Sequence, residues 1–342
     1  MLSSTLKFAN LSLVALTLLA YLAPLVNPNA FWPLSFLGLA FPALLFAHLA
    51  FILWWVLRRH AYVFFSLACL LVGGEHWGAL LRWPAKPLPP TEKSFRVVSF
   101  NMGKILMGSP EQLDRQKKRL RELFLQLGEV DILCAQECNE YMAGTLLEQE
   151  GFPHHHRFRG TAVFSRLPIL EAGEIPFENS VNSAHWVDVA IQGRRVRVFN
   201  VHLQSSRISY FTWKLSKNHD LQNPETWKGL RGILARYRAT ARMRARQAAR
   251  LRQAVENSPY PVLLCGDFNE PPNTYTYRLL SRGLQDSFRL RGGGWGSTYA
   301  GVFPFLRIDY ILADTSFRVL RHRVLRRPLA DHYPVIADLE FR

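Results

Sequence analysis

The sequence predicts a mixed α/β (α+β) fold in which two β-sheets pack face to face with helices outside them. A region of membrane-spanning helices is expected to precede this domain. Three observations predict this organisation. Residues 1–83 are almost all apolar, whereas residues 94–342 have the mixed composition of a soluble domain. Residues 84–93 are rich in proline and form a stiff linker between the two parts. In the soluble part, segments typical of strands and of helices both occur, without strict alternation.

The net charge limits the class of partner. The chain has 342 residues and a formal charge of +16. Residues 1–90 hold five basic residues and one acid, a net +4, which leaves +12 for the remainder. A basic domain favours nucleic acid, acidic lipid surfaces or phosphorylated small molecules, and charge alone does not choose among them. The four cysteines lack zinc or disulfide spacing, which indicates buried thiols.

Three apolar stretches open the chain, at Phe8–Val26, Phe31–Leu57 and Ala61–Leu81. The first two contain no charged residue, and the second can span a bilayer with some tilt. Glu75 and His76 interrupt the third, whose unbroken part would rise only ~21 Å as a helix, short of the ~30 Å hydrocarbon core. We therefore expect two or three spans. A cleaved signal peptide would explain only the first stretch, and a soluble helical hairpin rarely tolerates so long an uncharged run.

Basic residues predict the orientation of these spans, because they mark the cytoplasmic side. Lys7 precedes the first stretch, and the Arg58-Arg59 pair lies between the second and third. If the third stretch crosses, the soluble domain lies outside the cytoplasm; if it does not, the domain lies inside. We expect a multi-pass protein of the cell membrane with its soluble domain on the extracytoplasmic side.

Start and stop signals divide the soluble part into elements. A strand at 94–101 precedes a helix that Ser109 caps, with Pro110 at its first position and Gln112 completing a capping box. His154–His156 is expected to form a surface turn. Further helices are expected at 227–256 and 275–281, and further strands at 131–136, 161–165, 185–192, 194–200, 261–265, 308–312, 317–324 and 335–340.

Polar residues recur in or beside the ends of these strands. They are Asn101, Glu137, His202, Asp267, Asn269, Asp309, Asp331 and His332. Taken singly, each has an ordinary explanation as a turn residue, a helix cap or a satisfied core histidine. Burying so many polar groups beside apolar strands is costly unless they meet one another, a metal or a ligand. The ordered set therefore predicts one shared site.

The blocks around these residues resemble the endonuclease/exonuclease/phosphatase superfamily. In chain order they are Asn101, Gln136-Glu137, Ser165–Ile169, Asn200–Leu203, Gly266–Asn269, Ile308–Ile311 and Asp331–Val335. The resemblance covers nearly all of 94–342 and implies a DNase-I-like, four-layer αββα sandwich that hydrolyses phosphate esters. Ala330 departs from the family, which most often has serine there. His202 is more similar to the DNase, sphingomyelinase and phosphatase branches than to the apurinic-site endonucleases.

The resemblance implies a divalent metal, Mg²⁺ or alternatively Mn²⁺, held by Asn101, Glu137 and Asp331. Magnesium prefers hard oxygen ligands and screens the charge of the phosphate during attack. The implied catalytic residues are His202, Asp267, Asn269, Asp309 and His332. Asp267 would orient or deprotonate the attacking water, and Asn269 would hydrogen-bond the phosphoryl oxygens. Asp309 would align His332, and both histidines would contact the phosphate.

Candidate substrate contacts are Arg166, in one of the matching blocks, and Trp213 and Thr298, in loops next to catalytic residues. The loops 204–227 and 292–305 carry aromatic residues that suit lipid or base contacts, or ordinary packing. Residues 228–252 carry nine basic side chains and no acid, which indicates either phosphate contact or a solvated helix face.

Three functions stay open. The first is a membrane-surface phosphodiesterase or phosphatase that acts on a lipid headgroup, which the tether favours over nucleic acid. The second is a membrane-tethered nuclease. The third is a non-catalytic binding module. The presence of all the polar residues that the family resemblance assigns to catalysis argues against it. No protein partner can be inferred from the sequence.

Overall fold

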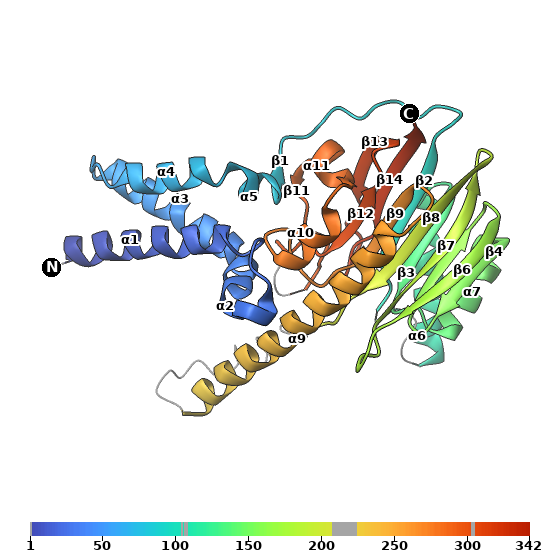
Figure 1. The fold of residues 1–342 in the computed structure, drawn as a ribbon, viewed down its shortest axis with the longest axis horizontal. Helices are drawn as coiled ribbons and strands as arrows, with labels where there is room; N and C mark the ends of the chain where they lie inside the picture. Colours follow the sequence, from blue (N-terminus) through green and yellow to red (C-terminus); the bar gives the residue numbers. More distant parts are fainter. Residues whose placement is uncertain (1, 104, 106–108, 207–223, 302–304) are drawn as a thin grey trace.

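The computed structural model describes residues 2–103, 105, 109–206, 224–301 and 305–342. Within them, two six-stranded sheets lie face to face, and helices cover the outer side of each (Figure 1). This arrangement confirms the predicted α/β sandwich and the helical region that precedes it.

The first sheet consists of β2 (Phe95–Asn101), β3 (Ile132–Gln136), β4 (His154–Phe158), β5 (Thr161–Ser165), β13 (Phe317–Val324) and β14 (Val335–Phe341), in the order β13-β14-β2-β3-β5-β4. The second consists of β6 (Ile169–Pro176), β7 (Ser183–Ile191), β8 (Arg194–His202), β9 (Val262–Asp267), β10 (Gln285–Asp286) and β12 (Asp309–Ala313), in the order β10-β12-β9-β8-β7-β6. The helices of the sandwich are α6 (Pro110–Leu127), α7 (Glu140–Glu150), α9 (Pro224–Glu256), α10 (Tyr275–Ser281) and α11 (Ser287–Arg291).

The N-terminal region contains α1 (Leu2–Tyr21), α2 (Pro28–Leu39), α3 (Phe41–Leu57), α4 (Val63–Val72) and α5 (Gly74–Gly78). A short strand pair, β1 (Leu81–Arg82) and β11 (Gly294–Trp295), joins this region to the sandwich.

Three hydrophobic clusters separate the four layers of the sandwich. The middle cluster fills the space between the sheets and includes Val97 and Val198 from facing strands. Leu123 of α6 belongs to the cluster under α6 and α7, and Leu251 and Leu280 belong to the cluster under α9 and α10. Alternate strand residues thus face either the other sheet or a helix layer, and little of either sheet face is left for water.

A polar bridge also crosses the apolar space between the sheets. The Gln136 amide donates to the Asn200 Oδ1 atom at 2.7 Å, and the Asn200 amide donates to the carbonyls of Ala135 and Ala162 at 2.9 and 2.8 Å. Both side chains are fully buried. Because a mispaired amide in this space would lose several hydrogen bonds, the bridge fixes β3 and β8 relative to each other. Catalytic candidates follow or end both strands.

The helices α1, α3 and α4 lie side by side and extend away from the sandwich (Figure 1). A buried polar network joins them: the His48 ring contacts the hydroxyls of Ser66 and Thr17, each at 3.0 Å, and Asn10 donates to Ser66 at 2.8 Å. Each helix contributes at least one partner. Side-chain hydrogen bonds of this kind hold apolar helices together where apolar contact alone does not select a partner.

The lengths of these helices differ from the expected spans. Ser4–Tyr21 is long and apolar enough to cross a membrane, and α2 with α3 passes the same test only as one span bent by 48°. The third stretch is not one helix, since α4 ends at Val72 and α5 starts at Gly74. Among the described residues, helix length therefore allows one span, or two with the bent pair, and three continuous spans are not supported.

The two ends of the helical region have different surroundings. The start of α1 and the turn between α3 and α4 lie together at the end far from the sandwich (Figure 1), where the Lys7 Nζ atom lies 5.3 Å from the centre of the Tyr62 ring. At the near end, Phe46, Trp295 and Phe305 form an aromatic cluster with ring centres 5.1–5.4 Å apart. The helical region is thus docked on the sandwich before the proline-rich linker begins.

Residues 84–93 form neither helix nor strand, and they run along the surface of the sandwich. The Leu88 N–H group donates to the carbonyl of Leu320 at 2.9 Å, and the Thr91 hydroxyl donates to Glu340 at 2.9 Å. These contacts fasten the segment to β13 and β14, so it acts as a strap rather than as a free spacer.

One local expectation was wrong. His154–His156 is not a turn but the start of β4, the edge strand of the first sheet. Its side chains are half-buried or exposed on both faces, which removes the alternation that marks a strand in the sequence. The helix after Ser109 begins at Pro110 as expected, and the Gln112 side chain accepts a hydrogen bond from the Ser109 N–H group at 2.9 Å.

Candidate active site

Two parallel strand pairs bring the candidate residues to one edge of the sandwich. Asn101 at the end of β2 is in register with the last residue of β3, which Glu137 follows. In the other sheet, His202 at the end of β8 is in register with Asp267 at the end of β9. The carboxyl ends of all four strands therefore meet, and the two sheets contribute facing halves of one site.

The Asp267 carboxylate is the centre of this site. Its Oδ2 atom accepts hydrogen bonds from the amides of Asn101 and Asn269 at 3.0 and 3.1 Å. The Nε2 atoms of His202 and His332 lie 3.7 and 3.8 Å from the same oxygen. Asp267 is 1% exposed, so four polar groups from four segments converge on one buried oxygen.

Asn269 holds Asp267 in place through a left-handed turn. Its φ angle is +52°, a conformation that asparagine tolerates better than most residues. The turn lets its backbone N–H group donate to Asp267 Oδ1 at 2.8 Å, while its amide donates to Asp267 Oδ2 and to the carbonyl of Leu203 at 2.9 Å. Both amide hydrogens are therefore used within the protein. This geometry supports a positioning role for Asn269, whereas the family resemblance implied that Asn269 hydrogen-bonds the phosphoryl oxygens.

Asp309 and His332 form a buried pair on the other side of Asp267. The His332 Nδ1 atom lies 2.9 and 3.1 Å from the two Asp309 oxygens, which leaves Nε2 directed toward Asp267. Thr298 supports the pair from behind: its hydroxyl accepts hydrogen bonds from the N–H groups of Ile308 and Asp309 at 3.0 and 3.1 Å. Thr298 is 1% exposed, so the structure places it behind Asp309 rather than on a substrate surface.

The electrostatics of the site follow from this burial. Burial alone would lower the pKa of His332, but the carboxylates of Asp309 and Asp267 outweigh it and raise that pKa to about 10. Burial and the nearby Asp309 charge raise the pKa of Asp267 above its usual range. His332 is accordingly a cation at neutral pH, paired with Asp309 and able to donate a hydrogen bond from Nε2.

Glu137 and Gly103 form the open side of the site. The Glu137 side chain is 49% exposed, and its Oε1 atom lies 3.4 Å from the Asn101 amide and 3.9 Å from His202 Nε2. A Cβ atom on Gly103 would lie 2.4 Å from Glu137 Oε2, so only glycine leaves this carboxylate its place. The His202 Nε2 atom is buried and has no hydrogen-bond partner among the described residues.

This open side fits a hydrated divalent cation. Magnesium retains several waters and binds through one or two carboxylates, and an accessible glutamate beside a buried aspartate offers that chemistry. The Asn101 amide donates to both Glu137 and Asp267, so it organises the carboxylates, and its Oδ1 atom accepts from the Gly103 N–H group at 3.0 Å. Sequence reasoning overlooked Gly103, for which the only signal was its position two residues after Asn101.

A second grouping of possible metal ligands differs from the predicted one. Among the described residues, ligand atoms of Asp267, Asp309 and His332 lie within 4.8 Å of one another. Asp309 and His332 are already hydrogen-bonded together and buried, which leaves little room for the waters that magnesium keeps. Asp331 belongs to neither grouping; its carboxylate adds to the charge that raises the pKa of His332. Glu137 lies outside this buried grouping and is the more accessible carboxylate at the site.

Another predicted substrate contact, Arg166, is not brought to this edge. Arg166 follows β5 at the opposite end of the first sheet, since Ser165 pairs with Ile132 at the start of β3. Its guanidinium donates to the Glu150 carbonyl at 3.3 Å and stacks on Phe152, so a substrate contact by Arg166 is contradicted by its position. Trp213 lies outside the described residues.

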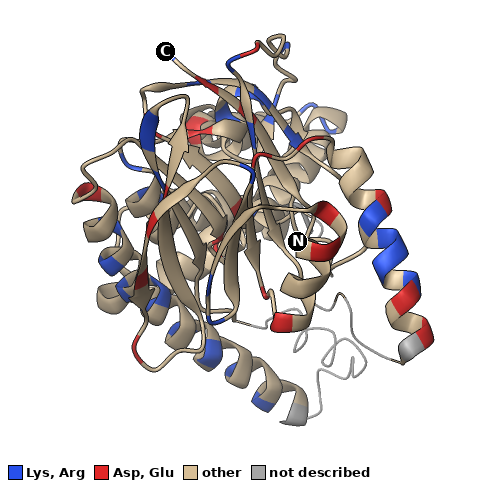
Figure 2. Cartoon of the chain, turned by 90° about the vertical axis from the view of Figure 1, so that its right-hand side faces the viewer, with Lys and Arg blue, Asp and Glu red and all other residues tan. Residues whose placement is uncertain are grey.

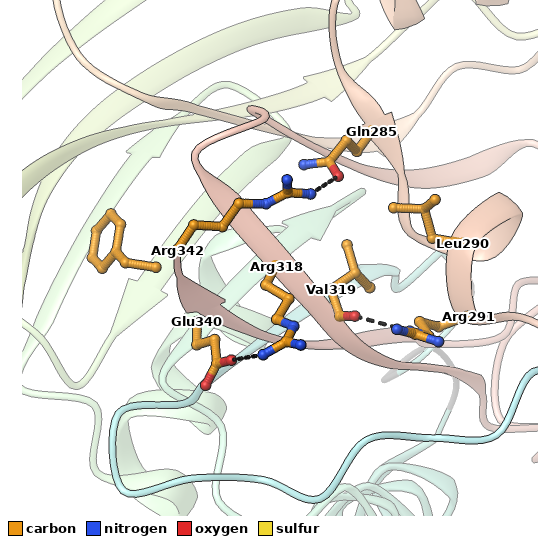
Figure 3. Close-up of a pocket in the computed structure, with 8 residues that line it drawn as sticks. Gln285, Leu290, Arg291, Arg318, Val319, Glu340 and Arg342 are labelled. Atoms are coloured by element: carbon orange, nitrogen blue, oxygen red, sulfur yellow. Dashed lines mark hydrogen bonds and ion pairs between the residues drawn. The ribbon is translucent and has the colours of Figure 1, made fainter.

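Two further features, the basic helix α9 and a surface hollow, contribute no residue to the group around Asp267 described above. Lys and Arg residues recur along α9, and no acid lies between residues 228 and 252 (Figure 2). Figure 3 shows a hollow of about 680 Å³ beside α11, β13 and β14. Its arginines are already engaged: Arg318 with Glu340, Arg342 with Gln285, and Arg291 with the Val319 carbonyl. Phe341, in its lining, is at the far end of β14 from His332.

Comparison with solved structures shows the same fold. The chain superposes on a humanized D. rerio TDP2 with a TM-score of 0.53 and 15% identity, over 73% of this chain and all of that one. The human Nocturnin catalytic domain with bound sulfate gives 0.53 and 17%, over 76% and all of that chain. A Bacteroides thetaiotaomicron mannosyl-6-phosphatase gives 0.51 and 18%, over 72% and all of that chain. No curated protein sequence matches the chain significantly.

Two family models match the sequence. Residues 3–80 match a domain of unknown function, DUF8431, which covers the helical region. Residues 98–332 match the Endonuclease/Exonuclease/phosphatase family, and this range contains every residue described above from Asn101 to His332. The chain therefore belongs to the endonuclease/exonuclease/phosphatase family, whose members hydrolyse phosphate esters.

Proposed function

We propose that the protein is a divalent-metal-dependent phosphodiesterase or phosphatase that is held at a membrane and acts on a lipid headgroup. One observation supports hydrolysis of a phosphate ester as the reaction. Two side-chain amides and two imidazoles surround Asp267 Oδ2, and the accessible Glu137 lies beside them. One buried carboxylate among hydrogen-bond donors suits a water nucleophile, and the imidazoles suit an anionic phosphoryl group.

In this proposal each residue has a defined task. Asp267 accepts a proton as the water oxygen bonds to phosphorus and the ester P–O bond breaks. His332, charged through Asp309, donates a hydrogen bond to a phosphoryl oxygen, and His202 stabilises the oxygen that leaves. A divalent cation at Glu137 would neutralise charge that builds on the phosphate. Asn101 and Asn269 keep Asp267 oriented toward the water.

The proposed membrane attachment rests on the N-terminal helices. Ser4–Tyr21 and the bent pair of α2 and α3 supply apolar length, and exposed leucines and phenylalanines cover much of α1 and α3. Lys7 and the Arg58-Arg59 pair both lie at the end remote from the sandwich. Positive residues mark the cytoplasmic side, and α4 and α5 together return the chain from that end to the sandwich (Figure 1). This supports the proposal that the remote end lies in the cytoplasm and the catalytic domain outside.

Reporter fusions after Trp83 test this orientation. A reporter that works only after export should be active there, and a reporter that works only in the cytoplasm should be silent. The same pair of reporters fused after Arg59 should give the reverse result. An active cytoplasmic reporter after Trp83 would place the catalytic domain inside the cell and contradict the orientation.

The preference for lipid rests on how close the helical region lies to the catalytic edge. The loop that follows Asn269 contacts it directly, since a Cβ on Gly38 would lie 2.1 Å from the Asn273 carbonyl. Asn27 also donates to the Tyr275 hydroxyl at 3.5 Å. A site held so near apolar helices gains effective concentration for a substrate in the same bilayer, and a soluble polymer gains little.

A substrate comparison tests the proposal on the full-length protein reconstituted in vesicles with Mg²⁺. We expect faster hydrolysis of phospholipid headgroups in those vesicles than of plasmid DNA or RNA at equal phosphate concentration. Addition of detergent should reduce this ratio by diluting the lipid, while hydrolysis of a small chromogenic phosphodiester changes little. Rapid DNA cleavage with no reaction on any headgroup class would make a membrane-tethered nuclease the better reading.

A further inference from the structure

The long helix α9 connects the helical region with the catalytic loops. On one side, the Tyr237 hydroxyl donates to the Ser35 carbonyl of α2 at 2.8 Å and contacts the Ser35 hydroxyl at 3.0 Å. The Phe36 ring packs edge-on against the Tyr237 ring, with centres 5.4 Å apart. Tyr237 is 1% exposed, so its contacts with α2 lie within a buried interface.

On the other side, Arg244 of α9 ties together the segments that follow two catalytic residues. Its Nε atom donates to Glu270 Oε1 at 2.7 Å, next to Asn269. Its Nη1 atom donates to the Gln204 carbonyl at 2.8 Å and to the Ser206 hydroxyl at 2.6 Å, shortly after His202. Arg244 and Glu270 are each 1% exposed. A fully buried arginine with three partners fixes the relative position of both segments.

The helix α2 also contacts the second of these segments directly. Gly38, near the end of α2, faces the backbone carbonyl of Asn273 at a distance that excludes any side chain. The Thr274 hydroxyl donates to the Pro271 carbonyl at 2.8 Å, which closes the turn that contains Asn273. The segment 270–275 is therefore held between α2 and α9, and it starts one residue after Asn269.

We propose that α2 is a working part of the active site, because it holds Asn269 and His202 in position through Arg244 of α9 and through the segment 270–275. This inference rests on the proposed phosphate-ester hydrolysis for its kinetic readout. It goes beyond that proposal because it assigns the N-terminal region a role in turnover of substrates that are not in a membrane. Arg244 is then a positioning residue, since it touches the loops rather than the substrate.

The test uses full-length protein in detergent with Mg²⁺ and a small soluble chromogenic phosphodiester, so that membrane delivery plays no part. Gly38→Ala forces α2 away from the Asn273 carbonyl. We expect kcat to fall by about 10-fold to 100-fold with little change in KM, because misplacement by about 1 Å costs up to ~10²-fold. Gly74→Ala is the matched control within the same region, because nothing lies within 4 Å of a Cβ there. Its kcat should stay within about twofold of the wild type.

A second variant and a structural measurement separate this inference from the proposed function. Tyr237→Phe removes only the hydroxyl that contacts Ser35 and should lower kcat in the same direction as Gly38→Ala. Amide hydrogen exchange should become faster at 203–206 and 270–275 in both variants, and not in Gly74→Ala. This exchange result would support the coupling even if the wild type hydrolysed no phosphate ester. Unchanged exchange in these segments, together with unchanged kcat in both variants, would overturn the inference.

Discussion

Chelation with EDTA is expected to abolish hydrolysis, and Mg²⁺ or Mn²⁺ is expected to restore it. The physical reason is the density of negative charge. Glu137, Asp267 and Asp309 lie within one small region, and a phosphate ester would add at least one more charge. The charged His332 offsets Asp309, with which it is paired, and this leaves the charges of Glu137 and Asp267 beside that of the phosphate. Without a cation, substrate binding and water attack are both opposed by repulsion.

The Glu137→Gln variant tests whether the Glu137 carboxylate is responsible for the metal dependence. The variant keeps the size of the side chain and removes the charge, so the Mg²⁺ concentration for half-maximal activity should rise by at least about tenfold. Glu140→Gln is the matched control, because Glu140 is an exposed residue in the first turn of α7, three positions later. A titration of activity against free Mg²⁺ measures both. Full activity of the wild type after thorough chelation would refute metal dependence.

Asp267→Asn should produce the second large effect, a fall in kcat of about 10²-fold to 10⁴-fold at saturating Mg²⁺ and substrate. The amide is nearly isosteric, and its oxygen can still accept from the Asn269 N–H group. Its NH₂ group, however, cannot accept from the side chains of Asn101 and Asn269, so the variant loses these hydrogen bonds as well as the ability to take a proton from the attacking water. The Mg²⁺ concentration for half-maximal activity should change much less than in Glu137→Gln.

Asp314→Asn serves as the matched control for this loss. Asp314 follows β12 at the end opposite Asp309, and its Oδ1 atom accepts from the Ser316 N–H group at 2.8 Å. An asparagine there can make the same hydrogen bond, and kcat should not change. Comparable thermal unfolding midpoints for the two variants would exclude global destabilisation as the cause. Retention of wild-type kcat by Asp267→Asn would remove Asp267 from the role of base.

The fold was largely predictable because its central strands are short, apolar and followed by polar residues. Thr161–Ser165 and Tyr275–Ser281 were expected with the boundaries that the structure shows. The edge strands β4 and β6 were not, and β6 illustrates the reason: Glu171, Gly173 and Glu174 interrupt its apolar pattern, and among the described strands it pairs with β7 alone. A strand paired on one side and half exposed carries little periodic signal.

The candidate site was predictable as a set and less so in its internal roles. Strand ends implied that Asn101, Glu137, His202 and Asp267 would meet, which is a matter of topology. Which group donates to which depends on distances of a few tenths of an ångström. Two such details are the inward hydrogen bond of the Asn269 amide and the position of Thr298 behind Asp309. No sequence pattern predicts either of them.

The partners of individual arginines on α9 were the least predictable feature. Arg244 looked like one more basic residue on a helix rich in arginine, yet it is almost fully buried, while its neighbour Arg246 is exposed. The difference arises because Glu270 and the Gln204 carbonyl, both distant in sequence, face that one position. A single sequence gives no means of telling which arginine of the row has such partners.

The β1–β11 pairing and the aromatic cluster of Phe46, Trp295 and Phe305 have a consequence for where the enzyme can act. A domain joined to its membrane helices by a flexible linker could change its orientation and reach an opposing bilayer. In this protein the helical region contacts the sandwich before residues 84–93 begin. The catalytic edge therefore keeps a fixed distance and orientation relative to the N-terminal helices. Under the proposed membrane attachment, we therefore expect hydrolysis in cis, on molecules of the protein's own membrane, and not on molecules of adjacent vesicles or cells.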